Sequence, residues 1–159
     1  MISMIACIGK NNELGKDNDL VFHLKRDMQF FRETTLNHTI VMGRKTFKSL
    51  KNSALPKRKN IIITSSLKNP PENVEIINNI QDIIEKYQDS EEEIFIIGGA
   101  SIYSAFLPYA KKLYLTEVDA RTNADVYFPE FDKAKYDKIE LEKGVENDIN
   151  FTISKYTAK

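Results

Sequence analysis

The chain has 159 residues, enough to bury a sizeable hydrophobic core, and we expect a single domain over residues 1–159. Its 23 Lys and Arg residues balance 23 Asp and Glu residues, which argues against a nucleic-acid partner or a membrane surface recognised through bulk charge. The single Cys7 excludes an internal disulfide, and the start MISMIACIG has no basic region or cleavage site, so we expect a cytoplasmic protein without a membrane span.

The predicted elements alternate between strands and helices. We expect strands at residues 1–8, 39–43, 60–66, 74–78, 93–99 and 111–120, and a closing hairpin over 137–156. We expect helices at residues 25–35, 43–50, 80–88 and 100–110, and a polar, glycine-punctuated loop over 9–20. This order predicts an α/β fold with a mostly parallel central sheet, helices on both faces and a C-terminal antiparallel hairpin. Ligands of such sheets bind at the carboxyl ends of the strands.

The helix over residues 25–35 carries an acid among apolar residues. Leu24, Met28 and Phe31 recur at the spacing of one helical face that packs toward the core, and Asp27 falls on the same stripe. An acid in the first turn is also favoured by the helix dipole. The helix alone leaves a capping role and a functional role for Asp27 equally open.

Three strand ends carry chemistry suited to a ligand. Arg44, Lys45 and Thr46 begin a helix after a strand, where cations are unfavourable for the helix, so we favour an anion site over solvated side chains. Gly98-Gly99 allows close approach of a ligand or serves a turn that needs positive φ, and both readings stay open. The hydroxyls of residues 64–66 suit a phosphate or a ribose, or belong to a polar turn.

Other chemistries fail on inspection of the residues. The stretch 9–16 resembles a phosphate-binding P-loop but is one residue too long, and Asp17 follows where a hydroxyl should bind magnesium. Two His and one Cys offer no convincing zinc spacing, so we expect no metal site, and there is no G-x-S-x-G elbow. The chemistry would then come from a bound cofactor.

Taken together, the stretches VMGRKTFKSL, LPKRKNIIITSS, IFIIGGASIY and LPYAKKLYLTEVDA, followed by DVYFPEF, resemble dihydrofolate reductases of the bacterial chromosomal type. The resemblance runs from MISMIA to the final strand. It implies reduction of 7,8-dihydrofolate to 5,6,7,8-tetrahydrofolate by NADPH, in support of one-carbon metabolism and thymidylate synthesis. Hydride would pass from nicotinamide C4 to pterin C6, with protonation at N5. It also implies binding of dihydrofolate and antifolate-type molecules. No large exposed apolar stripe is evident in the sequence, so we expect a monomer.

The resemblance assigns the cofactor site. Arg44 and the hydroxyls of residues 64–66 would select the 2′-phosphate of NADPH, Gly98-Gly99 would correspond to the family's cis peptide, and Leu20 would lie near the tip of a loop that closes over the nicotinamide. The implied contacts are Cys7, Ile8, Leu14, Gly15, Asn18, Leu20, Gly43, Arg44, Lys45, Thr46, Thr64, Ser65, Ser66, Gly98, Gly99, Ala100, Ser101, Ile102 and Tyr103.

The resemblance also assigns the substrate site. Asp27 would accept two hydrogen bonds from the pterin, Thr116 would hold Asp27, and Arg58 would bind the glutamate α-carboxylate. Apolar surroundings should raise the pKa of Asp27. The residues that the resemblance implies for catalysis are Asp27, Phe22, Leu20 and Thr116. The substrate contacts that it implies are Ile5, Asp27, Met28, Phe31, Arg32, Leu50, Leu55, Arg58, Ile97, Tyr103 and Thr116.

The chain departs from the family pattern at residues 21 and 22. Val21 and Phe22 stand where the family usually has Pro and Trp, and Phe22 lacks an N–H donor. Two other functions therefore stay open: a related reductase such as that of riboflavin synthesis, and an NADPH-binding module without catalysis. The combination of Asp27, Thr116 and Arg58 favours a dihydrofolate reductase over both.

Overall fold

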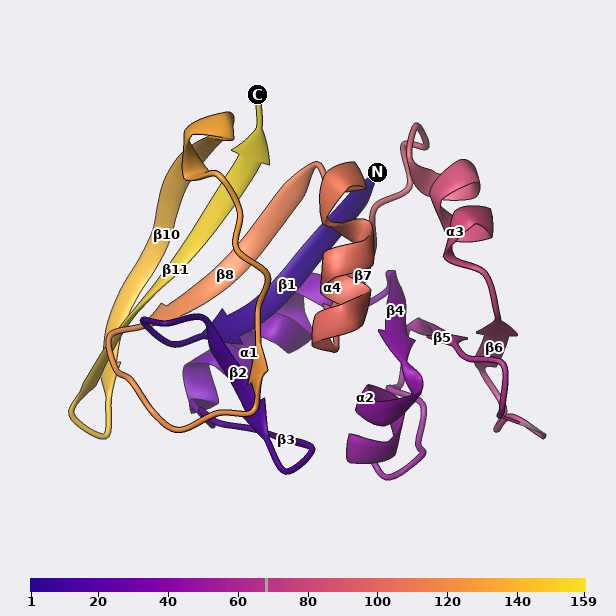
Figure 1. Ribbon diagram of the computed structural model, residues 1–159, viewed down its shortest axis with the longest axis horizontal. Helices are drawn as coiled ribbons and strands as arrows, with labels where there is room; N and C mark the ends of the chain where they lie inside the picture. The colour runs from indigo at the N-terminus through magenta and orange to yellow at the C-terminus, as the bar shows by residue number, and fades with distance from the viewer. Residues whose placement is uncertain (68) are drawn as a thin grey trace.

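The computed structural model describes residues 1–67 and 69–159 (Figure 1). The strands of its main sheet are β1 (Ile2–Ile8), β4 (Thr39–Gly43), β5 (Lys59–Ile63), β6 (Val74–Ile77), β7 (Ile94–Gly98), β8 (Lys112–Val118), β10 (Tyr136–Glu146) and β11 (Ile149–Ala158). The helices are α1 (Lys25–Thr35), α2 (Arg44–Ser49), α3 (Ile80–Tyr87) and α4 (Ala100–Phe106), with short 3-10 turns η1 (Leu107–Tyr109) and η2 (Lys133–Lys135). Among the helices of these described residues, none is both long and apolar enough to cross a bilayer.

The strands of the main sheet lie in the order β10-β11-β8-β1-β7-β4-β5-β6. Strands β1 and β4 to β8 pair in parallel, whereas β11 pairs antiparallel with β8 and with β10. Both the α/β class and the antiparallel C-terminal hairpin are confirmed. The observed bounds of α1 and β4 coincide with the predicted ranges.

Helices cover both faces of this sheet, as predicted. The alternation along β1 sends Met4 and Ala6 into a core shared with α3 and α4, while Ile5 faces a second core that contains Phe47 of α2. Side chains of a strand point alternately to its two faces, so one buried strand serves both cores. In Figure 1, α4 passes in front of the sheet and α1 lies behind it.

The prediction that residues 9–20 form only a loop is wrong. This stretch contains β2 (Glu13–Lys16) and β3 (Asp19–Leu20), which join β9 (Val126–Tyr127) in a small antiparallel sheet. Asp17 and Asn18 connect β2 to β3, and both have positive φ, 53° and 62°. Asn and Asp tolerate this conformation, which two-residue hairpin turns require.

The apolar stripe of α1 is not a core face. Leu24 is 3% exposed, but Met28 is 57% exposed and Phe31 is half-buried. Only part of the helix is covered by the sheet. The apolar stripe is therefore buried at Leu24 and exposed to solvent at Met28. Leu24 and Phe31 pack in two different apolar clusters, and Met28 is in neither.

Candidate active site

Asp27 meets two side chains that come from neighbouring strands. Cys7 of β1 and Thr116 of β8 are register partners, so their side chains leave the sheet on the same face. The Thr116 hydroxyl and the Cys7 thiol both hydrogen-bond to the carboxylate of Asp27. The predicted contact of Asp27 with Thr116 is therefore present, and Cys7, which we expected only at the cofactor, is a second partner of the acid.

The surroundings of Asp27 favour its protonated form. Burial raises the pKa of Asp27 above its ordinary value; the hydrogen bonds from Thr116 and Cys7 oppose this, and the charge of Glu146 adds to it. Burial and the nearby Asp27 also raise the pKa of the Cys7 thiol, which keeps Cys7 protonated and able to donate. The site thus holds a carboxyl group that binds a proton more readily than an ordinary Asp does.

This raised pKa predicts a pH-dependent cost in stability. The unfolded chain ionises Asp27 at the ordinary pKa, so between that pH and the raised pKa the folded state holds more protons and becomes less stable as pH rises. Asp27→Asn removes this titration. We expect the unfolding free energy of Asp27→Asn, measured relative to the wild type by urea titration, to increase from acidic to neutral pH. A difference that stays constant or decreases with pH would contradict the raised pKa.

An apolar cluster lies on the same face of the sheet as Asp27. Ile5 is buried within it, and four partly buried residues from α1, α2, the loop after α2 and β7 pack against it: Phe31, Leu50, Leu55 and Ile97. All five are among the predicted substrate contacts, whereas Met28, which was predicted with them, is exposed and is not part of this cluster. The partial exposure of the four residues leaves apolar surface available to a ligand.

The loop that carries Leu55 and Arg58 is held by a buried amide. The side chain of Asn60 accepts a hydrogen bond from the backbone N–H of Leu55 at 2.9 Å and donates to the carbonyl groups of Leu55 and Arg58 at 3.0 and 2.9 Å. Asn60 is fully buried, so an unmet hydrogen bond there would be costly. The loop conformation is therefore well determined by this one side chain.

Arg58 is oriented toward the end of α1. Its Nε donates to the Pro56 carbonyl at 2.9 Å, and its Nη1 donates to the hydroxyl of Thr35 at 3.1 Å. Burial, and then the charge of Arg32, lower the pKa of the Arg58 guanidinium. Two cations thus lie near each other beside the apolar cluster, which suits an anionic group at the far end of a ligand.

Arg44 and the hydroxyls after β5 form a second cationic site. The Nη1 of Arg44 donates to Ser66 Oγ at 3.0 Å, and Ser66 Oγ lies 3.2 Å from Thr64 Oγ1. A hollow of about 310 Å³ begins at this cluster and is lined by Thr64, Ser65, Ile76, Ile77, Asn78 and Asp82. The structure therefore brings together Arg44, Thr64 and Ser66, three of the four residues that we expected to bind a 2′-phosphate, and Ser65 lines the adjoining hollow.

The glycines at the ends of β4 and β7 allow α4 to pack closely against the ends of these strands. A Cβ added at Gly43 would lie 3.1 Å from Ile102, and one added at Gly98, where φ is +123°, would lie 3.3 Å from the Tyr103 ring. The Gly98–Gly99 peptide is cis. The half-buried Gly43, which directly precedes Arg44 and the first turn of α2, fits the predicted approach of a diphosphate to the backbone. The other predicted cofactor residues around these strand ends are exposed or half-buried: Lys45, Thr46, Ser65, Gly99, Ala100, Ser101 and Ile102.

Several predicted ligand contacts are buried in the core instead. Ile8, Leu14 and Tyr103 are each less than a tenth exposed, and Gly15 lies in the buried strand β2. The Tyr103 hydroxyl donates to the Ile5 carbonyl at 2.8 Å. A ligand could reach these residues only through their backbone or after a movement of the loop, so their predicted roles stay predictions.

The residues of the small sheet divide between surface and core. Leu20 and Asn18 are exposed at the β2–β3 hairpin. Phe22 is buried and packs with Cys7 and Leu24, so the residue that replaces the family's usual Trp fills space without offering a donor.

Glu13 anchors this small sheet and was not predicted from the sequence. Its side chain is 1% exposed and accepts hydrogen bonds from the backbone N–H groups of Asn11 at 2.6 Å and Thr122 at 2.8 Å. These bonds lower the pKa of Glu13, although its burial is the largest single influence and acts in the opposite direction. A lone acid in a polar stretch carries no sequence signal for such a role.

A larger hollow of about 660 Å³ lies at the β10–β11 hairpin and the loop after β1. Of the residues predicted to bind a ligand, only Ile8 lines it. Two lysines along it are paired with acids, Lys10 with Asp119 at 2.7 Å and Lys143 with Glu140 at 3.4 Å. It lacks Asp27, the two arginines and the glycines described above.

A parallel α/β sheet with glycines and cations at the carboxyl ends of its strands has the arrangement of a nucleotide-binding enzyme. The sequence model of dihydrofolate reductase matches residues 1–158. The chain therefore belongs to the dihydrofolate reductase family.

Individual relatives agree with this assignment. The chain is 38% identical to dihydrofolate reductase of Bacillus subtilis over 94% of its length and 88% of that protein, and 41% identical to the enzyme of Buchnera aphidicola from Acyrthosiphon pisum over 94% and 92%. Among solved structures, it resembles dihydrofolate reductase from Enterococcus faecalis complexed with NADP(H) and RAB-propyl. That match has a TM-score of 0.90 and 27% identity, and covers 100% of this chain and 96% of that one.

Proposed function

We infer that this chain catalyses the reduction of 7,8-dihydrofolate to 5,6,7,8-tetrahydrofolate with NADPH, the reaction of its family. The observation that carries the inference is Asp27, an acid with a raised pKa held by Thr116 and Cys7 beside an apolar cluster. A pterin needs one such acid at its polar edge and apolar surface along its ring. The product would feed one-carbon metabolism and thymidylate synthesis.

Asp27 binds and orients the pterin in this proposal. Its carboxylate accepts two parallel hydrogen bonds, from N3 and the 2-amino group, and Thr116 and Cys7 keep it in place. Protonation of N5 occurs through water, assisted by the raised pKa of Asp27. Ile5, Phe31 and the residues that pack with them exclude bulk water from the ring.

The cofactor residues act by binding and selection. NADPH, when bound, supplies the hydride. Arg44, Thr64 and Ser66 would hold its 2′-phosphate, and Gly43, just before the first turn of α2, would let the backbone approach its diphosphate.

A variant of Arg58 tests whether this residue binds the glutamate of dihydrofolate. Arg58→Leu is expected to raise the KM for dihydrofolate about 10- to 100-fold, because a charge-assisted pair with the glutamate α-carboxylate is lost. A dihydropterin without the glutamate should show no such change. Lys57→Gln, at the exposed neighbouring cation, is the control. An equal rise in KM with both substrates would show that Arg58 does not bind the glutamate.

The competing functions are separated by steady-state assays. Oxidation of NADPH is followed with dihydrofolate and, separately, with the aminopyrimidine substrate of the riboflavin-pathway reductase, and NADPH affinity is measured by fluorescence. Turnover of dihydrofolate alone supports the proposal. Turnover of the aminopyrimidine alone supports the related reductase, and NADPH binding with neither turnover supports a module that Phe22 has left without catalysis.

The proposal also covers the domain organisation, the oligomeric state and the location of the protein. We propose a single domain over residues 1–159 that acts as a monomer in the cytoplasm and binds antifolate-type molecules at the pterin site. The neutral formal charge and the free, buried Cys7 support this setting. Three exposed apolar residues on the edge strand β10, Ile139, Leu141 and Val145, are the first place to look for self-association if sedimentation shows a dimer.

A further inference from the structure

The first turn of α1, which carries Asp27, has no capping side chain of its own. Leu24 precedes the helix in an extended conformation and makes no side-chain capping bond. Backbone N–H groups in a first helical turn have no partner within the helix. Here the N–H of Lys25 donates to Glu146 Oε2 at 2.7 Å and the N–H of Arg26 donates to Glu146 Oε1 at 3.2 Å. One carboxylate at the end of β10 thus caps a helix about 120 residues earlier in the chain.

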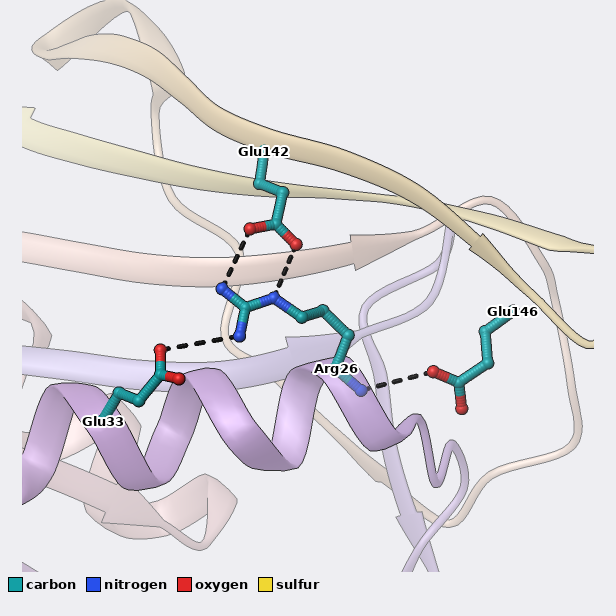
Figure 2. A network of polar contacts seen from close by, with 4 residues as sticks. All are labelled: Arg26, Glu33, Glu142 and Glu146. Atoms are coloured by element: carbon teal, nitrogen blue, oxygen red, sulfur yellow. Dashed lines mark hydrogen bonds and ion pairs between the residues drawn. The ribbon is translucent and has the colours of Figure 1, made fainter.

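A second acid of β10 holds the same turn by its side chain. Arg26 donates through Nε to Glu142 Oε2 at 2.6 Å and through Nη2 to Glu142 Oε1 at 2.9 Å, a bidentate pair. Arg26 also lies 3.5 Å from Glu33 on its own helix. Figure 2 shows Arg26 between Glu142 above it and Glu33 beside it, with Glu146 at the backbone N–H.

The register of the C-terminal hairpin determines that both acids face α1. The pairing of β10 with β11 shifts by one residue between Glu140 and Glu142. Beyond this bulge, Glu142 pairs with Ile153 and Gly144 with Phe151, so they share a face with residues that pack against Leu24. Gly144 has no side chain between the two acids, and an added Cβ would lie 2.5 Å from the Phe151 ring.

We propose that Glu146 is a positioning residue for Asp27: it caps α1 in place of Asp27, and so leaves the Asp27 carboxylate free for the pterin. Asp27 is the third residue of the helix, where an acid commonly turns back to the helix N-terminus. The Asp27 carboxylate instead meets Thr116 and Cys7. The proposal rests on the proposed function for the identity of the ligand, but the capping itself can be measured without turnover.

Glu146 also acts on Asp27 through its charge. The groups that face Asp27 are Cys7 of β1, Thr116 of β8, Tyr103 of α4 and Glu146 of β10. Burial is the main cause of the raised pKa of Asp27, and among these groups Glu146 is the one that raises it further by charge. Glu146→Gln keeps one acceptor oxygen and removes the charge, whereas Glu146→Ala removes both.

Three variants of the full chain test the proposal: Glu146→Gln, Glu146→Ala and, as a control, Glu33→Gln. Glu33 is a comparable acid beside Arg26 that makes no contact with the first-turn N–H groups. The Asp27 carboxyl is titrated by carbon NMR, the amide exchange of Lys25 and Arg26 is measured by hydrogen exchange, and KM is measured for dihydrofolate and for NADPH.

We expect Glu146→Gln to lower the pKa of Asp27. We expect Glu146→Ala to speed exchange at Lys25 and Arg26 about 2- to 30-fold, the loss of a helix cap. It should also raise the KM for dihydrofolate about tenfold through misplacement of Asp27, with little change in the KM for NADPH.

Unchanged exchange and an unchanged Asp27 titration in the Glu146 variants would overturn the proposal, as would equal effects in Glu33→Gln. If the wild type fails to reduce dihydrofolate, the proposed function fails, but the titration and the exchange still decide the role of Glu146.

Discussion

Asp27→Asn is expected to lower dihydrofolate turnover at neutral pH by about 100- to 10,000-fold, the range that positioned acid–base groups supply. The amide cannot take a negative charge, so it loses the paired hydrogen bonds to the pterin and the assistance to N5 protonation. Thr116 and Cys7 remain in place, since they lie on strands β8 and β1. Rates are measured at saturating NADPH across pH.

The variant should recover part of its activity in acid, where the substrate itself becomes protonated. Asp137→Asn, which changes an exposed carboxylate on β10, is the matched control and should behave as the wild type. Wild-type turnover by Asp27→Asn at neutral pH would remove Asp27 from the reaction.

Arg44→Leu is expected to raise the KM for NADPH about 10- to 100-fold and to leave the KM for NADH nearly unchanged, because only NADPH carries the 2′-phosphate. The geometry supports this, since Arg44 Nη1 already points to Ser66 at 3.0 Å. A cation in the first turn of α2 is unfavourable for the helix, so the variant should lose no thermal stability.

Lys48→Leu serves as the control, because Lys48 carries the same charge in the last turn of the same helix. The KM values for NADPH and NADH are measured by steady-state kinetics, and thermal stability is measured by a thermal melt. An equal rise in the KM for NADPH and for NADH would show that Arg44 does not bind the 2′-phosphate.

The sequence was informative where a local pattern decides the structure. The helical spacing over residues 25–35 and the apolar run over 39–43 predicted α1 and β4 with their observed bounds. The β2–β3 hairpin was missed, although Asp17-Asn18 between short segments is a two-residue turn signal. The strands β2 and β3 are very short and the stretch is polar, so we predicted a loop in spite of the turn residues.

The sequence was less informative where the role of a residue depends on register. The pairing of Cys7 with Thr116 follows from the alignment of β1 and β8, which no local pattern specifies. The contact of Glu146 with α1 depends on a one-residue shift in the hairpin. Met28 lay on an apolar stripe that predicted a core face, but it is exposed, because the stripe alone does not reveal how far the sheet extends beneath the helix.

The most direct test of the central claim follows the transferred hydrogen. Dihydrofolate is incubated with the wild-type chain and with NADPH that carries deuterium at the transferred position of nicotinamide C4, and the product is examined by NMR and mass spectrometry. The account predicts tetrahydrofolate with deuterium at C6, in an amount equal to the NADPH oxidised. Absence of tetrahydrofolate, or tetrahydrofolate without deuterium at C6, would contradict it.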